Sequence, residues 1–229
     1  MSRCCTLLFI VSLCAGCFQA EKKEPVEPVV LPSINWEEGK VSVEGALTEG
    51  EFRVKFETTA GDFVLLVHRD WAPLGAERLH DLVKSKFYDG VVFHQVNPGM
   101  IQFGISGDPE ATTYWDKPIS DEPVKESNYA AVVSFAKKGE NSRRTQLCIS
   151  LVQNSYMDEE GYSPLAEVES GWDVVKGINS EYGINASEEE IKERGNEYIF
   201  EKFPNMDYVI KATIVANEPN VDGPSGTQK

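Results

Sequence analysis

Residues 88–102 read Tyr88-Asp89-Gly90-Val91-Val92-Phe93-His94-Gln95-Val96-Asn97-Pro98-Gly99-Met100-Ile101-Gln102. Within and just after this stretch, the run Val91–Gln95 predicts one short strand, and Met100–Ile105 predicts a second. Between them, Asn97-Pro98-Gly99 is a turn sequence, because proline presets φ and glycine tolerates positive φ. The segment therefore predicts two short strands joined by a tight turn.

The residues before this stretch predict a β-hairpin followed by a helix. Phe52–Thr58 alternates apolar and polar residues, as a half-buried strand does, and Phe63–Val67 is a second strand after the turn Ala60-Gly61-Asp62. Asp70–Phe87 is predicted to be helical, with Pro73 in its first turn. Its apolar face consists of Ala76, Leu79, Leu82 and Val83.

The residues after the stretch predict more short strands and further helices. Strands are expected at Ala130–Ala136, Gln146–Leu151, Pro164–Val168 and Asp207–Val215, the last with Tyr208, Ile210, Ala212 and Ile214 on one face. A brief helix is expected at Trp172–Ile178, and a capping box, Ser187–Glu190, opens a helix that Pro204 stops. Many short strands with a few helices predict a mainly β fold, a closed barrel with helical caps.

The charge of the chain argues against nucleic-acid binding. There are 37 acidic and 22 basic residues among 229, which gives a formal net charge of −15. Such a surface repels phosphate backbones and gains nothing from an anionic lipid surface. We interpret the charge as a contribution to solubility.

The cysteines and histidines predict neither a disulfide nor a metal site in the folded part. Four of the five cysteines lie within the first 17 residues, and Cys148 is the fifth. No intramolecular disulfide is expected in the body of the chain unless Cys17 takes part. The three histidines share no ligand spacing with a second cysteine or a carboxylate pair.

Residues 1–16 have the pattern of a signal peptide. Arg3 supplies the positive charge, and Thr6–Leu13 is an apolar run far shorter than the ~20 residues of a transmembrane helix. The segment Leu13-Cys14-Ala15-Gly16-Cys17 resembles a bacterial lipobox, although Cys14 stands where an aliphatic residue is usual. This resemblance implies cleavage before Cys17 and a lipid on its thiol, with secretory cleavage after Ala20 as the alternative.

Three further regions follow the signal peptide. Residues 17–50 are predicted to be an acidic, proline-rich tether. Trp36 and the alternation of Val41 and Val43 are also compatible with an additional strand of the domain. Residues 51–217 are the predicted domain, and residues 218–229 a disordered tail. We therefore expect an exported protein of the cell envelope or periplasm, anchored at Cys17, or else a soluble secreted one.

The stretch Tyr88–Gln102 resembles the cyclophilin signature, Tyr-x-Gly-x-x-Phe-His-Arg-x-x-Pro-Gly-Phe-x-x-Gln. Two further motifs follow in order, Ser134–Ala136 with Thr145–Ile149, and Tyr156–Asp158 with Leu165–Val168. Gln102–Pro109 is similar to one bacterial branch of the family. The resemblance implies an eight-stranded antiparallel barrel with two capping helices, and a peptidyl-prolyl cis-trans isomerase. It also implies proline-containing peptides or unfolded proteins as partners, a monomer and no cofactor.

The resemblance assigns site residues position by position. Gln95 and Gln102 are the expected catalytic residues. Gln95 stands where the family has an arginine aimed at the prolyl nitrogen, and neutral hydrogen bonds are weaker than charge-assisted ones. Activity reduced by about tenfold or more is expected. The expected peptide-binding residues are Met100, Ile101, Ala136, Lys137, Gln146, Cys148, Tyr156, Met157 and Tyr162.

The expected groove is roomier and less aromatic than the family pattern. The loop between Gln95 and Gln102 is one residue shorter, and we expect the turn Asn97-Pro98-Gly99 to absorb the difference. Family aromatics are replaced elsewhere: Met100 and Ile101 supply one wall in place of a phenylalanine, Cys148 replaces another, Tyr156 replaces a tryptophan, and Tyr162 lies near the histidine position.

Several other residues have competing interpretations. His94 is interpreted as a structural residue that satisfies a hydrogen bond, and Cys148 as a small buried filler. The acidic first turn after Ser187 is interpreted as solvent-exposed. A basic cluster beside the groove either attracts acidic peptides, or supplies a substitute arginine, or is a solvated loop; it consists of Lys137, Lys138, Arg143 and Arg144.

Two main functions fit these observations. The first is isomerisation of X–Pro bonds in extracytoplasmic proteins with reduced activity, which the retained Gln102 and Gln146 favour. The second is a non-catalytic module that binds proline-containing peptides, which the altered aromatic set favours. A purely structural envelope lipoprotein is a third possibility.

Overall fold

The computed structural model describes residues 50–215. The strands are β1 (Glu51–Thr58), β2 (Gly61–His68), β3 (Gln95–Val96), β4 (Met100–Phe103), β5 (Val132–Phe135), β6 (Leu147–Ser150), β7 (Pro164–Ser170) and β8 (Val209–Val215). The helices are α1 (Pro73–Lys84), α2 (Pro109–Trp115), α3 (Ser155–Glu159), α4 (Trp172–Lys176), α5 (Glu188–Arg194) and α6 (Asn196–Lys202). The predicted signal peptide, Cys17, nearly all of the tether and the predicted tail lie outside the described residues. Within residues 50–215, no helix is long and apolar enough to cross a membrane.

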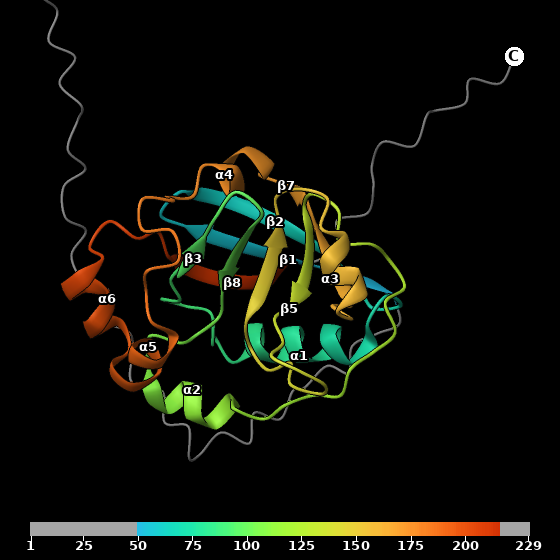
Figure 1. The fold of residues 1–229 in the computed structure, drawn as a ribbon, viewed down its shortest axis with the longest axis horizontal. Helices are drawn as coiled ribbons and strands as arrows, with labels where there is room; N and C mark the ends of the chain where they lie inside the picture. The colour runs from blue at the N-terminus through green and yellow to red at the C-terminus, as the bar shows by residue number, and fades with distance from the viewer. Residues whose placement is uncertain (1–49, 216–229) are drawn as a thin grey trace, which may run out of the picture.

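The eight strands form one antiparallel sheet in the order β3-β4-β6-β5-β7-β2-β1-β8. The sheet curls into a half-barrel (Figure 1), so the mainly β, eight-stranded fold is confirmed and its full closure is not. The two end strands, β3 and β8, do not pair with each other to close the barrel, and β3 has only two residues. The segment before β3 approaches the start of β8 instead, through an isolated bridge between Val92 and Tyr208.

The main core fills the concave side of the sheet. Alternation along β1 buries Val54 and Phe56, and β2 contributes Leu65 and Val67 in the same way. Helix α1 lies at one end of the curled sheet and α4 at the opposite end (Figure 1). The apolar face predicted for α1 is buried: Ala76, Leu79, Leu82 and Val83 all pack into this core.

A second, smaller core lies under α5 and α6. It joins these helices to the two segments that approach each other beside β3 and β8, through Val92, Ile105, Ala186, Ile191, Tyr198, Ile199, Met206 and Tyr208. The prediction of one uninterrupted helix from Ser187 to Pro204 is wrong, because Gly195 has φ +59° and separates α5 from α6. A Cβ at Gly195 would lie 2.0 Å from the carbonyl oxygen of Gly107, so no larger residue fits there.

Two local features of the strands and helices also differ from expectation. The register of β8 on β1 shifts by a bulge, since Glu57 pairs with Lys211 whereas Thr58 pairs with Val209. Ile210 is therefore 50% exposed, and its placement on the buried face is wrong. Helix α2 was not predicted; it is capped by Asp108, whose carboxylate accepts from the Glu110 N–H.

Candidate functional site

Strand pairing places the two expected catalytic glutamines opposite each other. Gln95 on β3 pairs with Gln102 on β4, Gln102 pairs with Cys148 on β6, and Cys148 pairs with Ser134 on β5. Residues directly opposite on antiparallel strands project to the same face of a sheet. The adjacent row, which includes Ile149, packs into the main core. The four paired side chains therefore form a row on the outer face of the half-barrel, in which Gln95 and Gln102 are partly exposed and Cys148 and Ser134 are buried.

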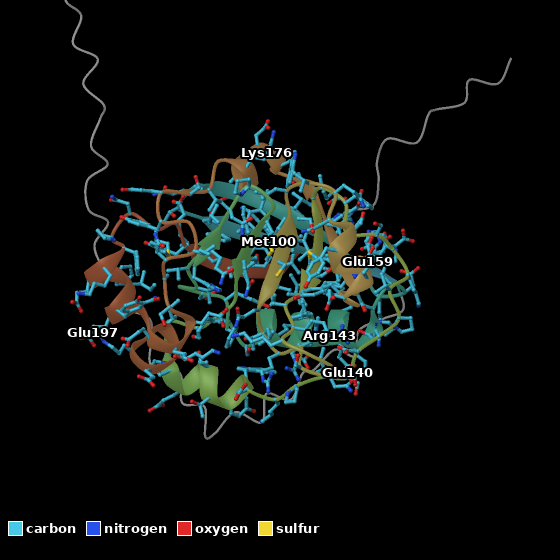
Figure 2. All side chains as sticks on the ribbon, viewed as in Figure 1. Met100, Glu140, Arg143, Glu159, Lys176 and Glu197 are labelled. Carbon is cyan, nitrogen blue, oxygen red and sulfur yellow. The ribbon has the colours of Figure 1, made fainter. Side chains whose placement is uncertain are left out.

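Ile101 lies in the core, so its assignment to the pocket wall is wrong. Its side chain is 1% exposed, and the period of two explains why: Gln102 faces outward, so its neighbour faces inward. Met100 shares the outer face and lies near the centre of this side of the sheet (Figure 2). Met157 of α3 lies beside it, since the Met157 Sδ accepts from the Oγ of Ser150, which pairs with Met100. Met100 and Met157 thus give the row an apolar border.

The side-chain amides of the site form a directed hydrogen-bond chain. Gln102 Nε2 donates to Gln146 Oε1 at 2.6 Å, and Gln146 Nε2 donates to Glu188 Oε2 at 3.3 Å. The thiol of Cys148 donates to Gln102 Oε1 at 3.7 Å. A carboxylate only accepts, so Glu188 fixes which end of the Gln146 amide faces α5 and which faces Gln102. Glu188 of α5 therefore sets the donor-to-acceptor direction of this chain of hydrogen bonds.

The segment 136–138 borders the row on the side of α3. The Ala136 N–H donates to the Gln146 carbonyl at 2.8 Å, which extends the pairing of β5 and β6. The Tyr162 hydroxyl donates to the Lys137 carbonyl at 3.1 Å. The ammonium of Lys137 pairs with Asp121 at 2.8 Å, outside the row. Tyr156 is 65% exposed and, with Tyr162, lines a hollow of about 470 Å³ between this segment and α3.

A buried polar network holds α3 against the sheet. Asp158 accepts from both the backbone N–H and the Nδ2 of Asn128 at 2.7 Å, and Asn128 Oδ1 accepts from Ser134 Oγ at 2.6 Å. Although burial disfavours its charge, the hydrogen bonds from Ser127 and Asn128 lower the pKa of Asp158. The network therefore fixes the position of α3, which carries Met157.

Cys148 and His94 are both buried groups beside the amide chain. Burial raises the pKa of the Cys148 thiol to about 12, so it is protonated, as expected of a small filler. Burial lowers the pKa of His94 to about 4, against the opposing effect of the Glu188 charge. The Val92 backbone and the Gln146 side chain act on the ring as hydrogen-bond partners and oppose this lowering, although neither ring nitrogen reaches full hydrogen-bond geometry among the described residues. His94 is thus a buried residue that packs beside the amide chain.

The members of the basic cluster differ in exposure: Lys138 and Arg144 are solvated, at 76% and 41% exposed, whereas Arg143 is buried. The Arg143 side chain is completely buried, and its guanidinium donates to Glu122 at 2.9 Å and to the Ser120 carbonyl. Arg144 pairs with Asp116 at 2.5 Å. Both guanidinium groups are thus held by carboxylates. Neither replaces the arginine that the family has at the position of Gln95, so the polar group there is the neutral Gln95 amide.

Comparison with known proteins identifies the family. The profile described as "Cyclophilin type peptidyl-prolyl cis-trans isomerase/CLD" matches residues 53–197. The chain belongs to this family. It is similar to peptidyl-prolyl cis-trans isomerase cypE of Dictyostelium discoideum, with 30% identity over 57% of this chain and 86% of that protein. It is also similar to peptidyl-prolyl cis-trans isomerase A of Dickeya dadantii, with 29% identity over 55% of this chain and 70% of that protein.

Solved structures show the same fold. A cyclophilin type peptidyl-prolyl cis-trans isomerase of Cryptosporidium parvum superposes with a TM-score of 0.55 and 17% identity, over 73% of this chain and 99% of that chain. A structure of the same description in the presence of the dipeptide Ala-Pro gives a TM-score of 0.55 and 16% identity, over 72% and 99%. The half-barrel and its helices are therefore the cyclophilin fold.

The site of this cyclophilin suits a reaction without covalent chemistry. Rotation about an X–Pro bond must break amide resonance, at a barrier of ~18–20 kcal/mol. Hydrogen-bond donors beside an apolar surface can favour the twisted amide over the planar one. Gln95 and Gln102 supply amide groups, and Met100, backed by the buried Met157, supplies the apolar surface. Among the described residues, no cluster of histidine, cysteine or carboxylate groups could hold a metal ion.

Glu188 is a residue of this site that sequence patterns did not indicate. Its side chain is 14% exposed, so the interpretation of the first turn of α5 as solvent-exposed is wrong for this residue. Although burial disfavours its charge, hydrogen bonds from Lys138 and Gln146 lower the pKa of Glu188. The sequence around Glu188 shows only the pattern of a helix N-terminus, and this pattern does not identify which side chain Glu188 contacts.

Proposed function

We propose that this cyclophilin catalyses cis-trans isomerisation of X–Pro bonds in extended protein segments, at a rate reduced by the neutral side chain of Gln95. The observation that carries the proposal is the outer row in which Gln95 lies opposite Gln102, beside Met100. An extended chain would lie along this row, with its proline ring on the apolar border. The Gln95 amide would donate to the prolyl nitrogen more weakly than a guanidinium does.

The test is an isomerisation assay on the full chain with a proline-containing peptide. Acceleration over the spontaneous rate is expected, together with a loss of about tenfold when Gln102→Ala removes the paired amide. An Asp173→Ala variant on α4 is the control, because that carboxylate is exposed at the end of the fold. No acceleration by a folded protein would overturn the catalytic proposal.

The second candidate is a non-catalytic peptide-binding module, and the amide chain favours it. Gln102 and Gln146 already bind each other at 2.6 Å, so a peptide must compete with that bond. Binding of the peptide without any change in its isomerisation rate would select this function. Measuring both quantities on the same preparation separates the two candidates.

We further propose that the protein acts outside the cytoplasm, attached to a membrane through Cys17. The support is the sequence alone: Arg3, the apolar run that follows it, and the small residues before Cys17. Growth with labelled fatty acid should label the wild-type protein and leave Cys17→Ser unlabelled. Equal labelling of the two, or none in either, would rule out the anchor.

A further inference from the structure

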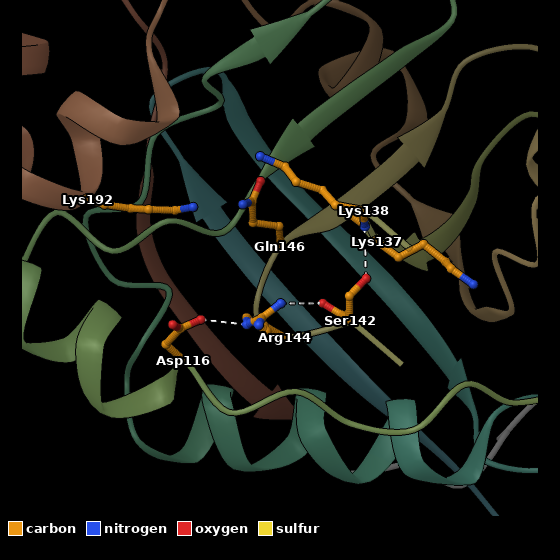
Figure 3. A pocket seen from close by; sticks show the side chains of 8 residues that line it. Asp116, Lys137, Lys138, Ser142, Arg144, Gln146 and Lys192 are labelled. Carbon is orange, nitrogen blue, oxygen red and sulfur yellow. Dashed lines mark hydrogen bonds and ion pairs between the residues drawn. The ribbon is translucent and has the colours of Figure 1, made fainter. Parts of the chain in front are cut away.

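A hollow of about 300 Å³ opens beside Gln146, between the loop after β5 and helix α5 (Figure 3). Three cations border it: Lys138 and Arg144 lie in the connection between β5 and β6, and Lys192 belongs to α5. Lys137 also borders the hollow, but its side chain extends away from the others (Figure 3). In a chain with a net charge of −15, this grouping of cations is a local exception.

Glu188, which is not among the residues lining the hollow, shows how two of these cations hold a carboxylate. The Oε2 of Glu188 lies 3.0 Å from the Lys138 ammonium and 3.8 Å from the Lys192 ammonium. The same oxygen accepts from Gln146 Nε2 at 3.3 Å. Two ammonium groups and one amide thus converge on a single acidic oxygen, as they would on the side chain of a ligand.

The cations remain available to a ligand. The side chains of Lys138, Lys192 and Arg144 are 76%, 43% and 41% exposed, so their present ion pairs are screened by water and readily exchanged. Their carboxylate partners are Glu188 and Asp116, which leaves one positive charge in excess. Gln146 borders both the hollow and the outer row, so a chain lying along the row can reach the hollow.

We propose that this hollow receives an aspartate or glutamate side chain of a bound peptide whose proline lies against Gln95 and Met100. The inference rests on the proposed peptide-binding function and adds a substrate class to it: acidic segments near a proline. Glu188 then acts as an internal competitor, because its carboxylate occupies the donors that the ligand requires.

The test uses the full chain and short acetylated, amidated peptides with one central proline. A single residue is varied as Glu, Gln or Lys at each position on either side of the proline, and Kd is measured by fluorescence anisotropy. At one position, Glu should bind about fivefold more tightly than Gln, and Lys more weakly than Gln. Equal affinity for Glu and Gln at every position, with measurable binding, would overturn this inference and leave the proposed function intact.

Variants assign the preference to the hollow. The double variant Lys138→Gln/Lys192→Gln should bring the ratio of Glu to Gln affinities close to one, whereas Glu188→Gln should raise it. Lys176→Gln on α4 removes an equally exposed cation elsewhere and should leave the ratio unchanged. A preference that survives the double variant would overturn the assignment to this hollow. Absence of binding by every peptide would overturn both this inference and the proposed function.

Discussion

Gln102 Nε2 donates to Gln146 Oε1 at 2.6 Å, which joins β4 to the residue just before β6 on the outer face of the half-barrel. The bond has a direction, because Glu188 accepts from the other end of the Gln146 amide. A residue of α5 therefore sets the orientation of both glutamines, although it does not lie in the row itself. Four predictions follow from this arrangement and its surroundings.

Replacing Glu188 by glutamine should loosen the orientation of the amide chain. A glutamine can both donate and accept, so the Gln146 amide is no longer confined to one orientation. We expect the isomerisation rate on an uncharged peptide to fall about threefold, through one weakened hydrogen bond. NMR of the Gln102 and Gln146 side-chain amides should show them shifted or broadened. Glu189→Gln removes the same charge from the same turn at an exposed position and should change neither measurement.

Replacing Gln95 by arginine should raise catalytic efficiency. A guanidinium forms charge-assisted hydrogen bonds, roughly twice as strong as neutral ones, and ~1.4 kcal/mol of added transition-state stabilisation gives about tenfold in rate. The measurement is kcat/KM on one proline peptide for wild type and variant. Ile210→Arg adds the same side chain at an exposed position of β8 and should have no effect. A folded Gln95→Arg protein with unchanged kcat/KM would contradict the prediction.

His94 should make the protein less stable as the pH falls from about 6.5 to about 4. The unfolded histidine takes up a proton near its ordinary pKa of 6.5, whereas the folded pKa is about 4. The unfolded state therefore binds more protons in this window, and stability decreases there by up to ~1.4 kcal/mol per pH unit. Burial is the largest cause of the lowered pKa; Glu188, the Val92 backbone and Gln146 oppose it, and Lys192 adds to it.

The His94 contribution is isolated by a variant of similar volume. In His94→Leu the free energy of unfolding, measured with urea, should decrease less steeply between pH 6.5 and pH 4 than in the wild type. Because the Gln146 side chain acts on the ring as a hydrogen-bond partner, the substitution should cost about 1 kcal/mol at pH 7. Parallel pH profiles for the two proteins would show that His94 does not titrate in this window.

Breaking the buried ion pair between Arg143 and Glu122 should destabilise the fold strongly. The two side chains are 0% and 7% exposed, so Arg143→Met leaves the buried Glu122 carboxylate without its charged partner, although the Leu74 and Gly75 N–H groups still donate to it. The expected loss is about 3 kcal/mol in the free energy of unfolding, and the double variant Arg143→Met/Glu122→Gln should recover part of it, since the amide keeps an acceptor for only one of the two backbone N–H groups. Arg194→Met removes an exposed ion pair with Glu201 and should cost under ~1 kcal/mol. A double variant no more stable than the single one would argue against this account.

The sequence identified most of the strands, the helix α1 and the turn that places Gln95 opposite Gln102, whereas the strand predicted at Val91–Gln95 is only Gln95–Val96 in the structure. Alternation and turn residues act locally, so Phe52–Thr58 and the turn at Pro98 identify their structures without distant contacts. The inward position of Ile101 also followed from the period of two, once Gln102 faced outward. The sequence therefore contained the information that Ile101 faces the core, although Ile101 was predicted to line the pocket.

Only the tertiary structure decided the partners of the charged side chains. Glu188 meets Gln146 across 42 positions of sequence, and Arg143 meets Glu122 across 21. The bulge that exposes Ile210 likewise depends on how β8 pairs with β1. A local pattern records whether a residue is polar or apolar, but the energy of a charge depends on its burial and on the groups around it. Those groups come from separate segments and are brought together only by the fold.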